Sequence, residues 1–164
     1  SPDGTTWTQR DTLTNVNKII WANNLFVSVG TNATPAGIIR TSPDGITWTT
    51  RFSSSSEVFT DVAFGNGIFI ATSSGTGIKF YTSADGITWT AQGTTAFPQM
   101  YSISFANGNF WALGGSGAAY TTTNGTAYTS SIMSSNHMVG LVWNGLDAYY
   151  AMNARGSLYK YTPG

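Results

Sequence analysis

Few side chains in this sequence could act as catalytic acids or bases. Glu57 is the one glutamate of the chain, and Asp61 follows it after three residues. Two carboxyl groups set across a glycosidic bond would suit a glycosidase. The serine-rich stretch before Glu57 instead indicates a solvated loop acid, and Asp61 stands near the start of a strand-like run. No nucleophile, base and orienting group are grouped in the sequence, and we therefore predict a protein that is not an enzyme.

Metal ligands and cofactor motifs are equally scarce. The chain has one histidine, His137, and no cysteine, so we expect His137 in a loop and neither a metal site nor a cofactor. Seven basic residues balance seven acidic ones, which gives no electrostatic attraction to nucleic acid. No run of about 18 apolar residues is present that could insert into a membrane. These observations favour a binding or structural role over catalysis.

One short motif recurs along the chain and must position whatever function the protein has. It reads Ser-Pro-Asp-Gly-Ile-Thr-Trp-Thr at residues 42–49 and recurs at 1–8, 83–90 and, in altered form, 122–129. Asp-Gly between β-forming residues is typical of a tight hairpin turn with positive φ at both central positions. The polar–aromatic alternation after it indicates a half-buried strand. We therefore predict a scaffold turn and an inward-facing ring in each copy, built on Asp3 and Trp7, Asp44 and Trp48, Asp85 and Trp89, and Asn124 and Tyr128.

Between the motif copies the sequence follows one plan. A strand-like run ends in an aromatic residue, a tight turn containing asparagine follows, and a second aromatic-led run comes next. A glycine-rich loop then leads to a third run, and the next motif opens a fourth. Aromatic residues that recur at the same station in every unit belong to the core rather than to a ligand site. They are Trp21, Phe64, Phe105 and Trp143 in the first run and Phe26, Phe69, Phe110 and Tyr149 in the second.

Four such units, with a period of about 40 residues, predict a radial array of antiparallel sheets. We expect one all-β domain, a four-bladed β-propeller of four-stranded blades, with repeats at residues 1–41, 42–82, 83–121 and 122–164. Residues 5–10 would form an outer strand without a blade, while the last unit has three strands without an outer one. Pairing of this N-terminal strand with the C-terminal blade is expected to close the ring. Because the sequence shows no initiator Met and no signal peptide, we also expect a mature, trimmed or excised domain.

The motif copies at residues 1–7, 42–48 and 83–89 resemble the Asp-box, or BNR, repeat of sialidase-like β-propellers, of the kind found in bacterial and phage proteins. The resemblance implies a propeller whose boxes lie on the face away from the ligand, so that the box aspartates serve as scaffold. In this sequence Asp and Gly are adjacent in the box, and the fourth copy has Asn124 and Tyr128. A sialidase-like enzyme would need a cluster of arginines, and the four arginines here stand at different stations of the repeat.

Positions that differ between the repeats carry whatever is individual to this protein. Two loop families differ most, and in a propeller they are expected to share one face. We predict that this face binds the ligand, because loops on a rigid scaffold are the usual carriers of recognition. One family joins each outer strand to the next inner strand (residues 10–15, 52–59, 93–100 and 132–137), and the other joins the second and third strands (residues 31–37, 73–77, 114–117 and 153–156). The candidate ligand-binding residues are Lys18, Asp61, Tyr101, Trp111, Phe97, His137 and Arg155.

Lys18 and Asp61 occupy the same station of neighbouring inner strands. We expect them at the mouth of the central channel, where they either contact a ligand or neutralise each other. Trp111, Phe97 and Tyr101 offer aromatic faces, and His137 and Arg155 offer donors, which is how uncharged ligands such as sugars are held.

The composition suits a binding module, because charged residues make up 9% of the chain and aromatic residues 14%. We predict a non-catalytic, lectin-like module that recognises a glycan through the variable loop face. The alternative is a structural or protein-interaction domain of a phage tail or larger surface protein, and a glycosidase-like enzyme comes third. An extracellular, cell-surface or virion location fits this composition. One chain closing alone is the first expectation for the assembly, and a two-chain ring of eight blades is the alternative.

Overall fold

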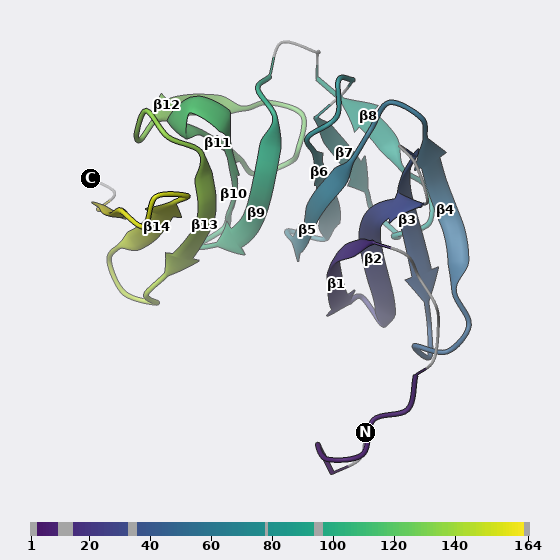
Figure 1. Cartoon of the computed structure of the whole chain (residues 1–164). Helices are drawn as coiled ribbons and strands as arrows, with labels where there is room; N and C mark the ends of the chain where they lie inside the picture. The colour runs from purple at the N-terminus through teal and green to yellow at the C-terminus, as the bar shows by residue number, and fades with distance from the viewer. Residues whose placement is uncertain (1–2, 10–14, 33–35, 78, 94–96, 163–164) are drawn as a thin grey trace.

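The structure is a computed structural model that describes residues 3–9, 15–32, 36–77, 79–93 and 97–162 (Figure 1). The described residues form β-strands and one short 3-10 turn, Gly115–Gly117. Consecutive strands pair into four antiparallel sheets, three with four strands and one with three. The strands are β1 (Val16–Ala22), β2 (Leu25–Asn32), β3 (Ala36–Ser42), β4 (Thr49–Ser54), β5 (Phe59–Gly65), β6 (Ile68–Ser73), β7 (Phe80–Ser83), β8 (Thr90–Gln92), β9 (Met100–Ala106), β10 (Asn109–Gly114), β11 (Ala118–Thr122), β12 (Thr129–Ile132), β13 (Met138–Trp143), β14 (Tyr149–Asn153) and β15 (Leu158–Tyr161).

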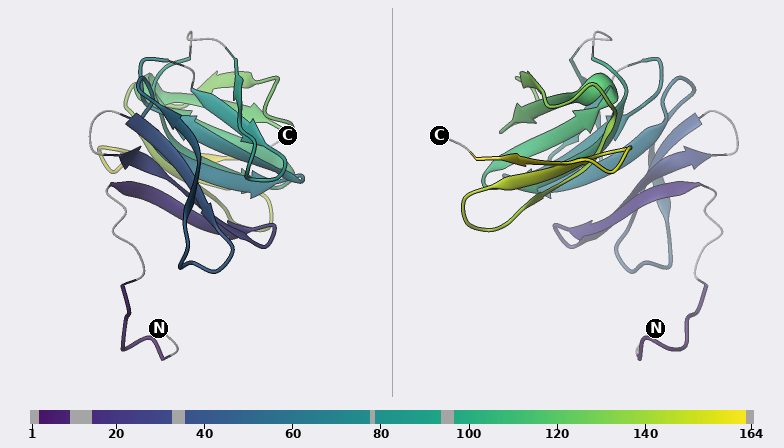
Figure 2. Two further views of the ribbon diagram at one scale, coloured as in Figure 1. Left: turned by 90° about the vertical axis from the view of Figure 1, so that its right-hand side faces the viewer. Right: turned by 60° about the vertical axis from the view of Figure 1, so that its left-hand side comes forward.

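The four sheets stand side by side as the blades of a propeller and form an open arc (Figure 1). The first blade is β1–β4, the second β5–β8, the third β9–β12 and the fourth β13–β15. The inner strands β1, β5, β9 and β13 pack on one another in that order. The views in Figures 1 and 2 place the first and fourth blades at the two ends of the arc. The prediction of an all-β propeller with four-stranded blades is confirmed, whereas the described part of the chain does not form a closed ring.

The N-terminal segment differs from its prediction. Residues 5–9 form no strand, and the side chain of Trp7 is 77% exposed. The segment projects beyond the first blade, whereas β15 lies at the other end of the arc (Figure 1). Closure by strand pairing is therefore wrong for this arrangement, because the open arc keeps the two ends apart. Arg10, the last residue of the predicted strand, lies outside the described residues.

The same ring pair recurs inside every blade. The two predicted aromatic stations lie in contact across the tight turn, with ring centroids 4.5 Å apart in the first and second blades, 4.8 Å in the third and 4.4 Å in the fourth. The second-run rings are buried in the three blades that follow another blade, where Phe69, Phe110 and Tyr149 are at most 2% exposed. Trp21 is 54% exposed, because it lies on the first blade at the end of the arc. The core prediction is therefore confirmed for Phe69, Phe110 and Tyr149, whereas it is wrong for the exposed Trp21.

Each inner strand carries a β-bulge at its second residue: Asn17, Thr60, Tyr101 and Val139. A bulge leaves one residue unpaired and redirects its side chain. Asn17 Nδ2 donates a hydrogen bond to the Phe59 carbonyl at 2.7 Å. Thr60 Oγ1 in turn donates to the Met100 carbonyl at 3.0 Å. The bulges of the first two blades therefore tie each blade to the next at the same point.

A tight turn with two positive φ angles connects the first two strands in the first three blades, whereas Asn144 in the fourth blade is not among the residues with positive φ. Asn66 and Gly67 have φ angles of 48° and 76°, and Asn107 and Gly108 have 49° and 76°. The first blade uses two asparagines, residues 23 and 24, at 51° and 57°. These are the angles of a type I′ hairpin turn, for which Asn and Gly have the least steric cost.

The repeated motif does not form this turn, which corrects the prediction. Gly45 has a φ of 73°, but Asp44 is not among the residues with positive φ. The loop is instead held by side chains: Ser42 Oγ accepts from the Gly45 N–H at 2.8 Å, and Asp44 Oδ1 accepts from the N–H groups of Ile46 at 2.8 Å and Thr47 at 2.9 Å. Asp is favoured here because its carboxylate can cap backbone donors two and three residues on. The motif is thus a capped loop of six residues between two strands.

Candidate functional site

The two variable loop families lie together at one end of the blades, as predicted. Backbone N–H groups of the second family donate to carbonyls of the first: Ser74 to Val58, Gly115 to Gln99 and Ala154 to His137, at 2.8–3.0 Å. We call the described residues of these loops the loop face; they are residues 15, 31–32, 36–37, 52–59, 73–77, 93, 97–100, 114–117, 132–137 and 153–156. Residues 10–14, 33–35 and 94–96 of the predicted loops lie outside the described residues.

Two of the seven predicted ligand-binding residues, Tyr101 and His137, are in contact between the third and fourth blades, and Arg155 lies on the loop bonded to His137. The ring of Tyr101 lies 5.4 Å from the ring of His137, edge-on at 84°. Arg155 follows Ala154, whose N–H donates to the His137 carbonyl at 2.8 Å. His137 and Arg155 are exposed, and the half-buried Tyr101 donates its hydroxyl to Gln99 Oε1 at 2.7 Å. We call Tyr101, His137 and Arg155 the loop-face patch.

Lys18 and Asp61 also meet, but Asp61 is largely occupied by the scaffold. Lys18 Nζ lies 3.8 Å from Asp61 Oδ1, and their side chains are 47% and 11% exposed. Asp61 Oδ2 accepts from Ser102 Oγ at 3.1 Å and from the Ile103 N–H at 3.0 Å, both in the third blade. Of the two roles predicted for the pair, mutual neutralisation fits this geometry. Lys18 is the member that remains accessible to solvent.

The structure contradicts the prediction that Phe97 and Trp111 present open aromatic faces. Phe97 is half-buried and packs edge-on against Phe80 at 5.1 Å and Tyr120 at 5.0 Å, in the core between the second and third blades. Trp111 is 7% exposed and lies 4.4 Å from the ring of Tyr149 in the fourth blade. Both residues looked individual in the sequence because the other repeats carry different residues at these stations. Their positions between blades show that they adjust the packing of neighbouring blades.

The contacts of the box aspartates support their prediction as scaffold residues, because each carboxylate binds the backbone of its own loop. Hydrogen bonds from the backbone of Thr47 and Ile46 hold the pKa of Asp44 below its ordinary value. Hydrogen bonds from Thr88 and Ile87 lower the pKa of Asp85 in the same way. A carboxylate that accepts several backbone N–H groups is stabilised in its charged form.

The altered fourth copy keeps the same loop with different atoms. Asn124 Oδ1 accepts from the Thr126 N–H at 3.0 Å and the Ala127 N–H at 3.3 Å. The Tyr128 hydroxyl donates to the Gly125 carbonyl at 2.8 Å, as the Nε1 groups of Trp48 and Trp89 do to their own glycines. Burial raises the pKa of Tyr128 above its ordinary value. The substitutions therefore preserve the hydrogen bonds that define the loop.

A buried polar cluster beneath the loop face was not predicted. Glu57 is 1% exposed, which corrects its interpretation as a solvated acid, and it accepts a hydrogen bond from Ser73 Oγ at 2.6 Å. Burial, together with the charge and hydrogen bonding of Glu57, raises the pKa of Tyr81 to about 12. Lys79 is also buried and donates to the carbonyls of Gly75 and Gly77, the latter at 2.7 Å. A lone lysine beside glycines was the one sequence signal that could have indicated this cluster.

Tyr81 and Glu57 are residue types that could form a catalytic pair, but both are too deeply buried for a substrate to reach them. Tyr81 is 4% exposed, and Glu57 is almost fully enclosed. Gly77 packs so closely that a Cβ atom there would lie 2.1 Å from Glu57 Oε1. A substrate could reach these groups only after the loop 73–77 had moved away. The cluster therefore stabilises the loop rather than presenting reactive groups.

A hollow lies between the third and fourth blades. It has a volume of about 360 Å³. The buried Nε1 atom of Trp111, one of its lining residues, has no hydrogen-bond partner. Its lining includes the aromatic rings of Trp111, Tyr149 and Tyr161, the hydroxyl group of Thr121, and the aliphatic side chains of Ile132 and Leu141. We call this hollow the blade 3–4 groove.

No three His, Cys, Asp or Glu side chains gather where they could hold a metal ion in the ranges that the structure describes. In the same ranges no helix is long and apolar enough to cross a membrane.

Comparisons with known proteins identify the fold family. A family model described as the DUF6242 beta propeller domain matches residues 42–164. No curated protein has a significant match to the chain. Among solved structures, the chain is similar to the computationally designed Ika4 protein, with a TM-score of 0.71, 12% identity and 96% of each chain covered.

Two structures of YCF48, a longer protein, are similar to this chain over part of their length. For YCF48 bound to D1 peptide the TM-score is 0.68 at 19% identity, covering 92% of this chain and 50% of that chain. For YCF48 from Cyanidioschyzon merolae the TM-score is 0.66 at 18% identity, covering 92% and 53%. The chain thus spans about half the length of the YCF48 chains. At these identities the likeness is one of fold.

Proposed function

This chain belongs to the DUF6242 β-propeller domain family, and we propose that it acts as a non-catalytic binding module that recognises carbohydrate through the loop-face patch. The observation that carries the proposal is the convergence of Tyr101, His137 and Arg155, which come from a bulged strand and two separate loops. Residues so far apart in the sequence meet only because the third and fourth blades pack together.

The chemistry of the patch suits an uncharged polar ligand. The Tyr101 ring offers an apolar surface, while the His137 imidazole and the Arg155 guanidinium offer hydrogen-bonding groups around it. Sugars are held in this way, by an aromatic surface and a few placed polar groups. The balanced charge of the chain, seven basic against seven acidic residues, provides no field that would favour a strongly charged ligand.

A non-catalytic role is supported by the state of the acidic groups. The Glu57 carboxylate is enclosed, Asp61 is bound by the third blade, and the box aspartates cap their own loops. None of these groups stands beside the loop-face patch as an acid–base pair. The contacts of the box aspartates also support the assignment of the motif as a variant Asp-box, with an extracellular, cell-surface or virion location as part of the same proposal.

The test is a glycan array followed by titration calorimetry on any glycan retained. We expect Tyr101→Ala and His137→Ala each to weaken binding at least tenfold, because each removes part of the contact surface. Ile87→Ala is the matched control, since Ile87 is an exposed side chain in a box loop away from the loop face. An array without a hit, obtained with protein of native stability, would contradict carbohydrate recognition.

A protein-interaction role is the second candidate, and the blade 3–4 groove favours it. The groove joins aromatic rings to the outer edge of β15, where a further strand could pair. The fold can carry such a role, because YCF48 has been solved bound to D1 peptide. A glycosidase-like activity remains third, and hydrolysis of chromogenic glycosides, abolished by Glu57→Gln, would be needed to support it.

A further inference from the structure

In the second and third blades, the box loop packs on the blade before it. Trp89, from the box of the second blade, belongs to the core cluster that contains Val27 of the first blade. Tyr128, from the box of the third blade, stacks on Phe80 of the second blade at 4.3 Å. Gly125 lies so close to the second blade that a Cβ atom there would come within 3.0 Å of Ile70 Cδ1. A box loop therefore fills the space between its own blade and the preceding one.

The corresponding space before the fourth blade is the blade 3–4 groove. Val27, Ile70 and Trp111 occupy one station of their blades, because they pair with Thr41, Thr82 and Thr121 respectively. A box loop lies over the first two of these stations, whereas Trp111 and Thr121 line an open hollow of about 360 Å³. The buried Nε1 atom of Trp111 has no acceptor among the described residues. The groove thus has the position and the shape of a site for a box loop.

The described N-terminal residues carry a formed box that lies outside the four sheets. Asp3 Oδ1 accepts from the N–H groups of Thr5 at 2.9 Å and Thr6 at 3.0 Å, and Trp7 Nε1 donates to the Gly4 carbonyl at 3.2 Å. These are the bonds that hold the boxes of the first and second blades. The loop is therefore arranged for docking before it meets a partner, while Trp7 is 77% exposed. Preorganisation of this kind lowers the entropic cost of binding.

Among the described residues, no strand occupies the outer position of the fourth blade, where the strand after such a box would lie. In the first three blades the third strand pairs on its outer side with β4, β8 or β12, whereas β15 has no partner strand there among the described residues. The residue after the box ring begins that outer strand in each case: Thr49, Thr90 and Thr129. Thr8 holds the same position after Trp7. Residues 8 and 9 thus hold, after their box, the sequence position at which the outer strand begins in the first three blades.

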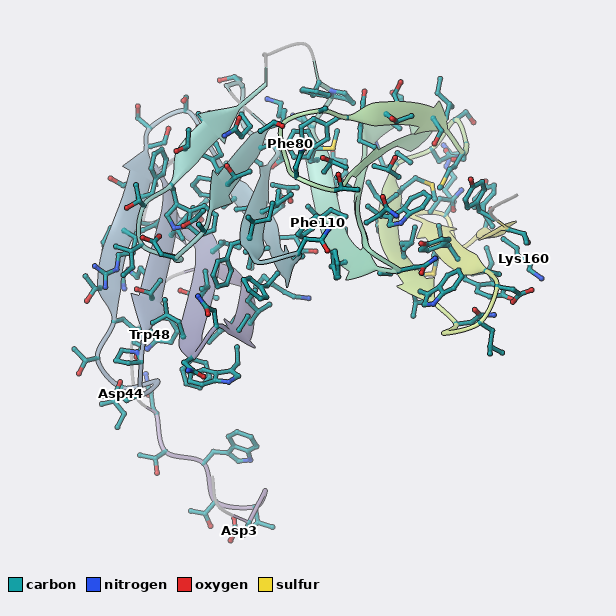
Figure 3. All side chains as sticks on the ribbon, turned by 180° about the vertical axis from the view of Figure 1, so that it is seen from behind. Asp3, Asp44, Trp48, Phe80, Phe110 and Lys160 are labelled. Atoms are coloured by element: carbon teal, nitrogen blue, oxygen red, sulfur yellow. The ribbon has the colours of Figure 1, made fainter. Side chains whose placement is uncertain are left out.

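The N-terminal box and the blade 3–4 groove lie at opposite ends of one molecule. Figure 3 shows Asp3 on the projecting N-terminal segment, beyond Asp44 and Trp48 of the first blade, and Lys160 at the far end of the arc. Large apolar side chains are exposed at both ends: Val16, Ile19 and Trp21 on the first blade, and Val142, Met152 and Leu158 on the fourth. Exposed apolar surface at two ends that do not meet is the signature of a head-to-tail interface.

We propose that two copies of this chain join head to tail into an eight-bladed ring, in which residues 3–9 of each copy complete the fourth blade of the other. Head-to-tail contacts give a closed assembly when the rotation between copies closes, and an arc of four blades closes with two copies if each spans half a turn. The arc covers about half of the longer YCF48 chains with the same fold. Strand addition to an open sheet edge provides the main-chain hydrogen bonds of the interface.

The register of this contact follows from the complete blades. Thr90 pairs with Thr82, which pairs with Ile70. Lys160 pairs with Tyr150 of the fourth blade and so holds the station of Thr82. Thr8 of one copy is therefore placed opposite Lys160 of the other. Trp7 then enters the groove beside Trp111, whose Nε1 donates to a backbone carbonyl of the incoming loop.

The molar mass in solution is the first test. Light scattering on the whole chain is expected to give twice the 17.4 kDa of one copy. Trp7→Ala is expected to weaken the dimer at least tenfold, because it removes the aromatic anchor of the interface. Ile87→Ala, in a box that already has its blade, is expected to leave the mass unchanged. A species of one chain at all concentrations up to about 1 mM, where even weak complexes form, would overturn the proposal.

A cysteine pair distinguishes exchange between copies from closure within one. The chain has no cysteine of its own, so Thr8→Cys with Lys160→Cys introduces one defined pair. Oxidation is expected to give a covalent species of two chains on a non-reducing gel. Thr5→Cys with Lys160→Cys, which is out of register, is expected to crosslink far less. A crosslink confined to single chains would contradict the exchange and support ring closure by one copy, and an equal yield from both pairs would contradict the register.

Discussion

The Oδ2 atom of Asp61 in the second blade lies 3.0 Å from the backbone nitrogen of Ile103 in the third, and 3.1 Å from Ser102 Oγ. Asp61 is also 3.8 Å from Lys18 Nζ in the first blade. One carboxylate thus connects three blades, and its two connections differ in burial.

The two partners of Asp61 should therefore respond unequally to mutation. Asp61→Ala leaves the Ile103 N–H without its acceptor in a buried site, and we expect a loss of about 1–3 kcal/mol in the free energy of unfolding. Lys18→Ala removes only a partly exposed ion pair, for which about 0–1 kcal/mol is expected. Urea denaturation of both variants measures the difference. Equal losses, or a larger loss for Lys18→Ala, would contradict the role assigned to Asp61.

Asn66 ties the tight turn of the second blade to the third blade. Its Nδ2 donates to the carbonyls of Gly108 at 2.9 Å and Thr123 at 3.0 Å. Asn66→Gly keeps the backbone angle without strain but removes both bonds. Asn107→Gly is the matched control, because Asn107 has a φ of 49° against 48° for Asn66 and no such bond to the fourth blade among those described. We expect Asn66→Gly to cost about 1 kcal/mol more in thermal or urea unfolding, and similar costs would argue against the tie.

The box aspartates should make the fold sensitive to acid. Their pKa values are lowered by backbone hydrogen bonds, from Thr47 first at Asp44 and from Thr88 first at Asp85. A folded-state pKa below the unfolded value contributes stability that is full at neutral pH and is lost as the pH falls through the folded-state pKa. We expect the free energy of unfolding of Asp44→Asn/Asp85→Asn to fall less between about pH 5 and pH 2 than that of the unmodified chain. The measurement is urea denaturation at a series of pH values.

Asn124→Asp gives the reciprocal control for the box aspartates. It introduces a carboxylate that can accept from the same N–H groups of Thr126 and Ala127. This variant should steepen the loss of stability in acid. Acid profiles that coincide for all three proteins would show that the capping bonds carry no charge-dependent stability.

Tyr81 should produce the opposite dependence in alkali. Burial and then Glu57 raise its pKa to about 12, above the value of about 10 for an unfolded chain. The folded state therefore holds the proton more tightly, and stability falls as the pH rises from about 10 toward 12. We expect Tyr81→Phe to flatten this fall, and Glu57→Gln to reduce it partly, because burial remains. Alkaline unfolding curves of equal slope for Tyr81→Phe and the unmodified chain would contradict this assignment.

Sequence reasoning reached the parts of the fold that repeat. Asn66-Gly67 and Asn107-Gly108 have a local steric requirement for positive φ, so their turns could be predicted without knowledge of the rest of the chain. Phe69 and Phe110 could be assigned to the core because the same station is aromatic in every unit. Tyr128 could be placed beside Trp48 and Trp89 because it follows the same box pattern. In each case the information lies within a few residues or in the period.

Contacts between blades were harder to predict, because they depend on the angle at which the blades meet. Trp111 stands where Val27 and Ile70 stand, and only the packing of the fourth blade shows that its ring is buried. The sequence indicated an exposed loop acid at Glu57, whereas the structure shows it buried and in contact with Ser73 and Tyr81. No short stretch of the sequence indicates how strongly the arc curves. Closure of the ring was predicted only from the order of the strands along the chain.

The successive packing of the blades has a consequence for how the molecule loses structure. The second blade is covered on both sides and its strand β6 is buried along most of its length, whereas β13 in the fourth blade is half-exposed. In a linear stack each unit is stabilised mainly by its nearest neighbours, so an isolated arc frays from its two ends while the middle stays folded. Amide exchange in one copy would then be graded, slow in β6 and fast in β13 and β1. A ring has no ends, and joining two arcs would convert this gradual fraying into a single cooperative transition.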